Sequence, residues 1–483
     1  MGIAYLNCES EFAVARRWLI LLLFAQALAN LFWLSPAAHS GQVAIPWLML
    51  RGKTLFGAIW EQHAPGSSLL AAAAQALLPL DPALVARLLN ALLVALLTLL
   101  VYWLARRLCS EAAGLAAALV FAWWLPVYGN VMLYFDTLLA LCVLAGLCLY
   151  FARCPLSWQR LLCMGLCFGA ATLFKQHAWL AVAVAGLWLL ADDWRRMVIY
   201  LLGALLLPLL QWLALAAAGL WDNYLYWNWA FNLSGLMDGL PLDGDFLRKL
   251  LLGDLLVLPF ALLAWRQERR WLLPPLLWLA ALSTIYPRVG EIHAMAQLPF
   301  AAVMSGVMLA KLRAAMREAG NWDVPRLTVA GLALGVGIGW LWTGAVSYLP
   351  TELDAGATLG YDEFRPLAEA LKTHAQPGDT LFILPQADST PQLHPLTGLL
   401  PPGTWVKGWR WYFRPPHVLP HLKREWADAP PDWVIVFPDL LPAGAPGIYE
   451  LLAIVKDEDE YELAFTVADI YWHGRANVYA RAP

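Results

Sequence analysis

Long apolar runs, each of about 16–22 residues, recur along the chain from about residue 18 to Pro350. A helix needs about 20 such residues to cross the hydrocarbon of a bilayer, and there it satisfies all of its own backbone polar groups. Charged residues make up 14% of the chain, whereas a soluble protein has about 25%. The pattern therefore predicts an all-α polytopic membrane bundle over most of the chain.

The basic clusters indicate the direction of each crossing, because short cytoplasmic loops carry an excess of Lys and Arg. These clusters lie at 16–17, 106–107, 195–196, 266–270 and 311–326. All of them fall on one side if the N-terminus is cytoplasmic and about eleven helices span the membrane. The predicted spans are 18–35, 84–105, 112–128, 136–153, 161–176, 178–192, 197–220, 249–265, 271–286, 295–312 and 327–347.

The apolar run 67–80 is not counted as a span. It is too short to cross comfortably, and a crossing there would move Arg106, Arg107 and every later basic cluster to the outside. We expect a helix that lies in the outer leaflet. Two outer loops, 36–81 and 221–248, then belong to a membrane domain of residues 1–349.

After Pro350 the composition becomes polar and rich in proline, without a further apolar run long enough to span. Residues 367–379 have the pattern of an amphipathic helix followed by a turn, and 380–384 and 433–437 have the pattern of buried strands. This alternation predicts a small α/β domain over 350–483, which the topology places on the extracytoplasmic side.

Several classes of protein are excluded by composition. The formal net charge is −3 and there is no basic arm, so nucleic acid is not an expected partner. The seven cysteines form no CxxC pair, which is evidence against a zinc site or a disulfide framework. The first apolar run lacks a cleavage site before a soluble chain, so we interpret it as a retained helix and not as a signal peptide.

Polar side chains at the outer ends of the predicted spans are the candidates for chemistry. Ionisable groups there are costly unless paired or hydrated, so they indicate function. Together they offer carboxylates for a general base or a divalent cation, and basic groups for a phosphate leaving group. The candidates are His39, Glu61, His63, Asp136, Lys175, Gln176, His177, Arg288, Glu291 and His293.

Simpler interpretations of these residues stay open. One such interpretation is that Glu61 and His63 are loop side chains that face water. Another is that Asp136 stabilises the start of its helix. Lys175 is compatible with a side chain that extends to the membrane surface. The aromatic run 224–231 suits an interfacial belt as well as a surface on which a sugar stacks.

Five segments together resemble a known family. They are LMLRGKTLFGAIWEQHAPGSSLL, the helix that opens at Asp136, LFKQHA, the aromatic loop with NWAFNLS, and PRVGEIHAMAQLPF. Their order and spacing resemble bacterial integral-membrane glycosyltransferases of the GT-C class. The likeness is to the protein O-mannosyltransferase and aminoarabinose-transferase-like set, which includes lipopolysaccharide-core glycosyltransferases, and it covers roughly residues 17–312.

The resemblance implies an inverting transfer of a sugar from a polyprenyl-phosphate donor. The acceptor would be an envelope glycan, lipid or protein at the periplasmic face of the bacterial inner membrane. Glu61 and Asp136 match acids of the family that bind a metal or the donor, so a divalent cation is an expected cofactor. Lys175 matches a lysine near the donor phosphate, and Arg288 with His293 matches a basic pair.

Other residues are expected around these groups. Gln176 is expected beside the phosphate, and the substrate cavity is expected to include His63, His177, Trp227 and Asn232.

The chain departs from the family at one position. The family has an Asp just after the first span, and the corresponding place, around Ala38–Ser40, holds none. Glu61 is therefore the preferred base, with His39 as the alternative because an imidazole titrates near neutrality. Two other functions stay open: a catalytically degenerate relative that acts as a scaffold, and a lipid or solute transporter, although no internal repeat is visible.

Overall fold

The computed structural model describes residues 2–33, 40–128, 132–152, 156–237, 239, 243–286, 289–318, 337–347, 362–386, 390–441, 446–457, 459–470 and 474–482. The chain forms two compact units, each assembled from several segments. The first unit combines residues 1–34, 90–212 and 239–351. The second unit combines residues 35–89, 213–238 and 352–483.

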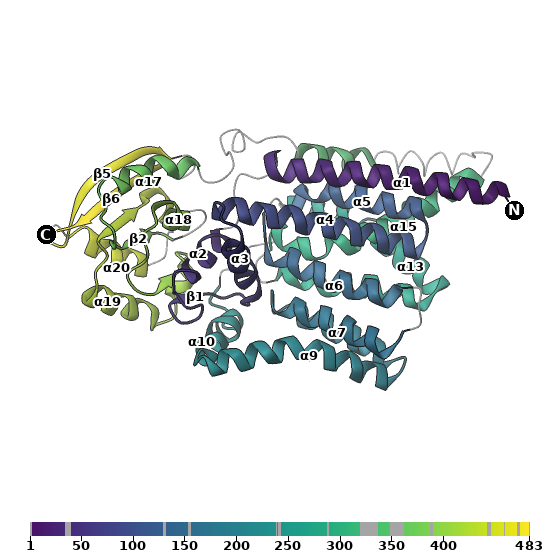
Figure 1. Ribbon diagram of the computed structural model, residues 1–483, viewed down its shortest axis with the longest axis horizontal. Helices are drawn as coiled ribbons and strands as arrows, with labels where there is room; N and C mark the ends of the chain where they lie inside the picture. The colour runs from purple at the N-terminus through teal and green to yellow at the C-terminus, as the bar shows by residue number, and fades with distance from the viewer. Residues whose placement is uncertain are drawn as a thin grey trace. The chain divides into compact units, whose positions relative to one another are not determined.

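Helices make up the first unit, and Figure 1 shows several of them side by side. They are α1 (Gly2–Leu28), most of α4 (Pro82–Leu108), α5 (Glu111–Trp124), α6 (Phe135–Phe151), α7 (Trp158–Thr172), α8 (Ala178–Leu190), most of α9 (Trp194–Ala217), α12 (Gly244–Gly253), α13 (Val257–Gln267), α14 (Leu273–Leu282) and α15 (Leu298–Glu318).

Five helices in the described part of the chain are long and apolar enough to cross a membrane. They cover Val14–Phe32, Pro82–Leu108, Glu111–Tyr128, Trp194–Ala217 and Leu298–Arg317. Shorter apolar helices lie at Phe135–Phe151 and Ala178–Leu190, among others. The multi-pass helical character predicted from the sequence is confirmed, and the number of eleven spans stays a prediction. Residues 327–336 of the last predicted span lie outside the described residues.

Two predicted spans differ from the helices that form. The run 249–265 is divided between α12 and α13, where the backbone leaves the helix at Asp254. Tyr128 approaches Gly253, the last residue of α12, so closely that a Cβ there would lie 2.4 Å from its hydroxyl. The run 271–286 forms α14 between two short 3-10 turns, η5 (Arg269–Leu272) and η6 (Ser283–Ile285).

Close helix contacts in the first unit depend on small residues. A Cβ on Gly165 of α7 would lie 2.1 Å from the backbone oxygen of Tyr200 in α9. A Cβ on Gly203 would likewise lie 2.2 Å from the oxygen of Leu162. Small residues let helix backbones approach in this way where the surroundings are apolar.

The second unit combines short helices with strands. Its N-terminal part contains α2 (Ala44–Met49), β1 (Ile59–Trp60) and α3 (Gly66–Leu77), and its middle part contains α10 (Trp221–Leu225), the π-helical turn η4 (Tyr226–Ala230) and α11 (Phe231–Leu233). Helix α3 is about 18 Å long, which is less than the roughly 30 Å of a bilayer core. This length agrees with the treatment of 67–80 as a non-crossing segment.

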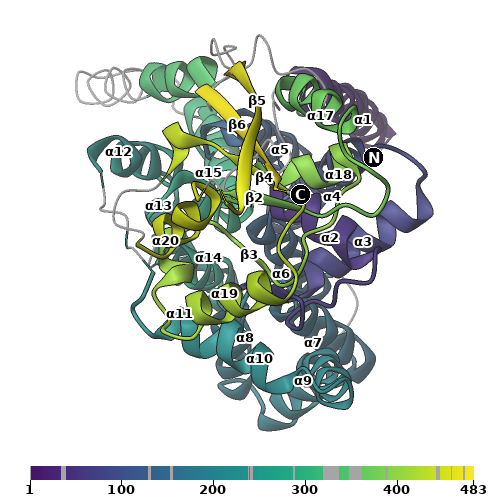
Figure 2. The same ribbon diagram turned by 90° about the vertical axis from the view of Figure 1, so that its left-hand side faces the viewer.

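The C-terminal part of this unit carries a four-stranded sheet in the order β2-β4-β6-β5. Strands β2 and β4 are parallel, and β6 is antiparallel to both β4 and β5. In Figure 2, α17 and α18 lie on one side of these strands and α20 on the other. The elements are α17 (Arg365–Lys372), β2 (Leu381–Leu384), α18 (Leu393–Thr397), β3 (Trp405–Val406), α19 (Val418–Asp428), β4 (Trp433–Val436), α20 (Pro446–Val455), β5 (Tyr461–Ile470) and β6 (Gly474–Arg481).

The strands at 380–384 and 433–437 and the helix near 367 thus form where the sequence places them. The compact second unit, however, also includes residues 35–89 and 213–238. Strand β1 of the first loop pairs in parallel with β3, with Ile59 opposite Trp405 and Trp60 opposite Val406. The domain boundary at 349/350 and the outer position of an α/β domain stay predictions.

The α7–α9 contact leads to a test of packing. We expect Gly165→Ala to destabilise the protein by about 1–3 kcal/mol, because the added methyl forces two backbones apart. The measurement is the thermal unfolding midpoint of the detergent-solubilised protein. Gly244→Ala is the matched control, since a Cβ at Gly244 meets nothing within 4 Å. Equal midpoints for the two variants would show that this contact does not limit stability.

Candidate functional site

A buried ion pair in the first unit joins three of the predicted site residues. The ammonium of Lys175 lies 2.8 and 2.9 Å from the two carboxylate oxygens of Asp136. Nδ1 of His293 lies 3.3 Å from Nζ of Lys175 and 3.6 Å from Oδ2 of Asp136. We call Asp136, Lys175 and His293 the aspartate cluster.

The chain direction of the helices brings these residues to one end of the unit. Asp136 lies in the first turn of α6, and Lys175 follows the end of α7, which returns from the opposite end. His293 lies in the 3-10 segment η7 (Glu291–Ala296), just before α15. The hydroxyl of Thr284 donates to the backbone oxygen of His293 at 2.6 Å and holds η7 against the end of α14.

Two further predicted residues lie on the same turn as Lys175. His177 is half-buried, with Nε2 3.2 Å from the backbone oxygen of Tyr286. Gln176 is also half-buried. Lys175 itself is only 5% exposed, so its side chain is held within the protein by Asp136 and does not extend to the membrane surface.

A second buried ion pair lies in the second unit, where it follows from the pairing of β1 with β3. Glu61 comes directly after Trp60, the last residue of β1, and Lys407 comes directly after Val406, the last residue of β3. Because Trp60 and Val406 are partners in a parallel pair, the next residues of both strands are neighbours. Nζ of Lys407 lies 2.9 Å from Oε2 of Glu61.

His63 completes this second group, which we call the glutamate cluster: Glu61, His63 and Lys407. Nδ1 of His63 is in direct contact with Oε1 of Glu61, and the backbone N–H of His63 donates to the same oxygen at 3.1 Å. Burial by itself would raise the pKa of the Glu61 carboxyl, but Lys407 and His63 outweigh burial and hold this pKa well below its usual range. Glu61 is therefore a stable carboxylate.

The loop that carries the glutamate cluster is fixed by its backbone. The oxygen of Gln62 accepts hydrogen bonds from the side-chain amides of Asn228, at 3.2 Å, and Asn232, at 2.8 Å. The N–H of Gln62 donates to the hydroxyl of Tyr412 at 3.2 Å. Asn232, which the sequence places in the substrate cavity, thus holds the backbone between Glu61 and His63.

Trp227 does not offer an open surface to a sugar. It is 2% exposed, and its ring stacks on Trp60 at 5.1 Å and on Tyr412 at 5.5 Å between centroids. Trp227 therefore belongs to the core beneath the loop, and its part in a substrate cavity stays a prediction.

The two clusters have the same composition: one carboxylate, one lysine and one histidine. In each cluster the histidine has the most exposed side chain. The exposed fractions of the side chains are 2% for Glu61, 6% for Lys407 and 15% for His63. In the aspartate cluster they are 0% for Asp136, 7% for Lys175 and 17% for His293.

This arrangement suits proton transfer by the histidines. A lysine balances the charge of each buried carboxylate, and the carboxylate in turn fixes an imidazole whose pKa lies near neutrality in water. A divalent cation fits these clusters less well, since each carboxylate already has a lysine ammonium in contact with it. Among the described residues no three His, Cys, Asp or Glu side chains gather as a ligand set. Metal binding by Glu61 or Asp136 stays a prediction.

Some predicted residues cannot be placed, and one important residue was missed. His39 and Arg288 lie outside the described residues. Lys407 was not among the candidates, because the C-terminal segment contains no motif that indicates a site. The one available signal was a single lysine inside the aromatic stretch TWVKGWRWYF, where an unpaired ammonium would be costly to bury.

Comparisons with known proteins agree with the resemblance stated from the sequence. Residues 62–215 match the family model of dolichyl-phosphate-mannose-protein mannosyltransferases. This segment is less than half of the chain; it contains Asp136 and Lys175 and begins one residue after Glu61. No curated protein sequence gives a significant match.

The structure is similar to that of ArnT from Cupriavidus metallidurans in the apo state. The TM-score is 0.62 at 16% identity, over 97% of this chain and 98% of that chain. ArnT bound to undecaprenyl phosphate matches with a TM-score of 0.59 at 15% identity, over 97% of both chains. The oligosaccharyltransferase AglB from Archaeoglobus fulgidus, in complex with an inhibitory peptide and a dolichol-phosphate, gives 0.55 at 11% identity, over 97% and 74%.

At these identities the similarity is one of fold. The matched proteins are GT-C membrane glycosyltransferases, so the predicted resemblance to this class is confirmed.

The glutamate cluster leads to a prediction about stability. We expect Lys407→Met to lower the free energy of unfolding by about 3–5 kcal/mol at neutral pH, because Glu61 would be left buried without its cation. The variant's Glu61 would then take up a proton more readily when folded than when unfolded. The deficit relative to the wild type should therefore shrink as the pH falls toward 4.5, the ordinary value for this carboxyl.

The measurement is the thermal unfolding midpoint in detergent as a function of pH. Lys372→Met is the matched control, because Lys372 forms an exposed pair with Glu369 that contributes about 0–1 kcal/mol. The double variant Glu61→Gln/Lys407→Met should recover much of the loss. A deficit that is the same at every pH would rule out the buried-charge explanation.

Proposed function

We propose that this protein is a membrane glycosyltransferase that moves a sugar from a polyprenyl-phosphate donor to a hydroxyl group of an envelope glycan, lipid or protein. The reaction takes place at the periplasmic face of the bacterial inner membrane and inverts the configuration at the anomeric carbon. The N-terminus is cytoplasmic in this proposal. The GT-C fold supports the general reaction, and one structural observation carries the proposal: each buried carboxylate–lysine pair holds a partly exposed histidine.

The chemistry defines what the protein must supply. The acceptor oxygen attacks the anomeric carbon, a new C–O bond forms, and the bond between the anomeric carbon and the phosphate oxygen breaks. The hydroxyl proton must go to a base, and the released polyprenyl phosphate gains a negative charge. An enzyme for this step needs one group to accept the proton and another to stabilise the phosphate.

His63 is the base in this proposal, and Glu61 positions it. Glu61 keeps a low pKa, so it holds a proton weakly, whereas a neutral imidazole accepts one readily near pH 7. The contact between Nδ1 of His63 and Glu61 fixes the orientation of the ring and stabilises the imidazolium that forms. This assignment replaces Glu61 as the preferred base and requires no acid at the family's missing Asp position.

The aspartate cluster supports binding of the leaving phosphate. Asp136 and Lys175 neutralise one another, so the pair alone attracts an anion weakly. A protonated His293 adds a positive charge and N–H donors on the more exposed side of the pair.

Transfer assays test the two roles. We expect His63→Ala to lower the rate of transfer by about 100-fold or more, as loss of a general base does. His293→Ala should also lower the rate, because the leaving phosphate loses part of its stabilisation. The assay measures radiolabelled sugar that passes from a polyprenyl-phosphate-linked donor to an envelope acceptor fraction, with purified protein in liposomes. His374→Ala is the matched control, because His374 is exposed and belongs to neither cluster.

The roles also predict different kinetic signatures. His63→Ala should retain affinity for the lipid-linked donor, whereas His293→Ala should bind it more weakly. Variants that keep the wild-type rate and unfolding midpoint would overturn both assignments. Wild-type protein that moves the donor across the bilayer without forming a glycosidic product would show a transporter, and protein that does neither would show a scaffold.

A further inference from the structure

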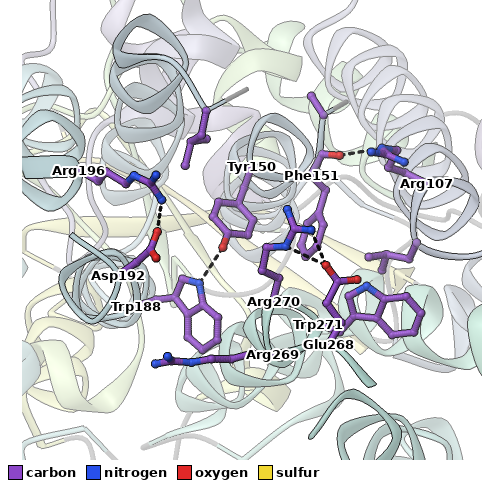
Figure 3. Close-up of a pocket in the computed structure, with 13 residues that line it drawn as sticks. Arg107, Tyr150, Phe151, Trp188, Asp192, Arg196, Glu268, Arg269, Arg270 and Trp271 are labelled. Carbon is purple, nitrogen blue, oxygen red and sulfur yellow. Dashed lines mark hydrogen bonds and ion pairs between the residues drawn. The ribbon is translucent and has the colours of Figure 1, made fainter. Parts of the chain in front are cut away.

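A cavity of about 810 Å³ lies in the first unit at the opposite end from the aspartate cluster. It is lined by Tyr150 and Phe151 of the last turn of α6, whereas Asp136 lies in the first turn. Tyr150 lies 14 positions after Asp136, which corresponds to about 21 Å along the helix. Figure 3 shows the cavity and its side chains. Because of this distance along α6, the cavity is separate from the aspartate cluster.

The cavity is rich in guanidinium groups. Four arginines line it, namely Arg107, Arg196, Arg269 and Arg270, against two carboxylates, Asp192 and Glu268. Arg196 pairs with Asp192, and Nε and Nη2 of Arg270 donate to Oε1 of Glu268 at 2.8 and 2.5 Å. Both pairs are partly exposed and therefore contribute little stability. The two pairs account for two of the four arginines, so the other two leave an excess of positive charge in the cavity.

The other two guanidinium groups carry this excess. Arg107 uses Nε to donate to the backbone oxygen of Phe151 at 2.9 Å, which is one of five donors in a guanidinium. Arg269 lies over the ring of Trp188, 5.5 Å from its centroid, and within the described part of the chain it has no carboxylate partner. Figure 3 shows Arg107 and Arg269 on opposite sides of Arg270.

Aromatic side chains place this end at the level of lipid headgroups. Trp158 begins α7, Trp194 begins α9 and Trp265 lies near the end of α13, and these helix ends adjoin the segments that line the cavity. The three tryptophans are 60%, 60% and 79% exposed. Exposed tryptophans at one end of apolar helices mark the boundary between hydrocarbon and water.

We propose that this cavity binds the phosphate of an anionic phospholipid headgroup, with Arg107 and Arg269 as its ligands. Guanidinium groups match phosphate oxygens with paired N–H donors, and basic cavities between membrane helices recognise such headgroups. The Trp188 ring, held by a 3.0 Å hydrogen bond from its Nε1 to the hydroxyl of Tyr150, keeps Arg269 in place. This proposal does not depend on the proposed glycosyl transfer.

Native mass spectrometry of the full chain in detergent tests this site. Cardiolipin, phosphatidylcholine and inorganic phosphate serve as separate probes. We expect saturable retention of cardiolipin and none of phosphatidylcholine, with affinity for cardiolipin about tenfold or more weaker in Arg107→Gln/Arg269→Gln. The single variant Arg269→Gln, which leaves the Arg107–Phe151 contact intact, should show part of this loss.

Arg195→Gln/Arg266→Gln is the matched control, since it removes two positive charges near the same helix ends from residues outside the cavity lining. It should retain the wild-type affinity. The proposal is overturned if the control weakens binding as much as the cavity variant, if phosphatidylcholine is retained equally, or if millimolar inorganic phosphate displaces cardiolipin and so shows a site for soluble phosphate.

Discussion

A carboxylate without access to water needs a cation in contact with it, and this requirement organises both clusters. The side chains of Glu61 and Asp136 are each at most 2% exposed, and each has a lysine within 2.9 Å. The cost of burying either charge alone would be several kcal/mol. The ion pairs therefore tie together segments that are distant in sequence: the first loop with the C-terminal part, and α6 with the turn after α7.

The histidines follow from the same requirement. Once a lysine has neutralised its carboxylate, the carboxylate can still accept a hydrogen bond from an imidazole without a further charge being buried. His63 and His293 take this position, and they are more exposed than the pairs behind them. General acid–base chemistry needs a titratable side chain that is held in place and exposed to the substrate. In both clusters the buried carboxylate–lysine pair holds an imidazole in this way.

Much of the architecture was predictable because it depends on local patterns. Apolar runs and basic clusters predicted a multi-pass helical chain, and the patterns at 380–384 and 433–437 predicted two buried strands that form as β2 and β4. The close contact of Gly253 with Tyr128 was not predictable, because it joins segments that are distant in sequence. The burial of Trp227 could not be predicted either, because an aromatic residue has the same sequence signature in a core as on a binding surface.

The sequence by itself determined that this chain is a helical membrane protein and that Glu61, Asp136, Lys175 and His293 are unusual in their apolar surroundings. Hydrophobicity and the cost of charge act residue by residue, so they can be read along the chain. Only the tertiary structure decided which charges neutralise one another. The register of β1 on β3 places Lys407 against Glu61, and such a register depends on backbone hydrogen bonds and packing between distant segments, for which no local signal exists.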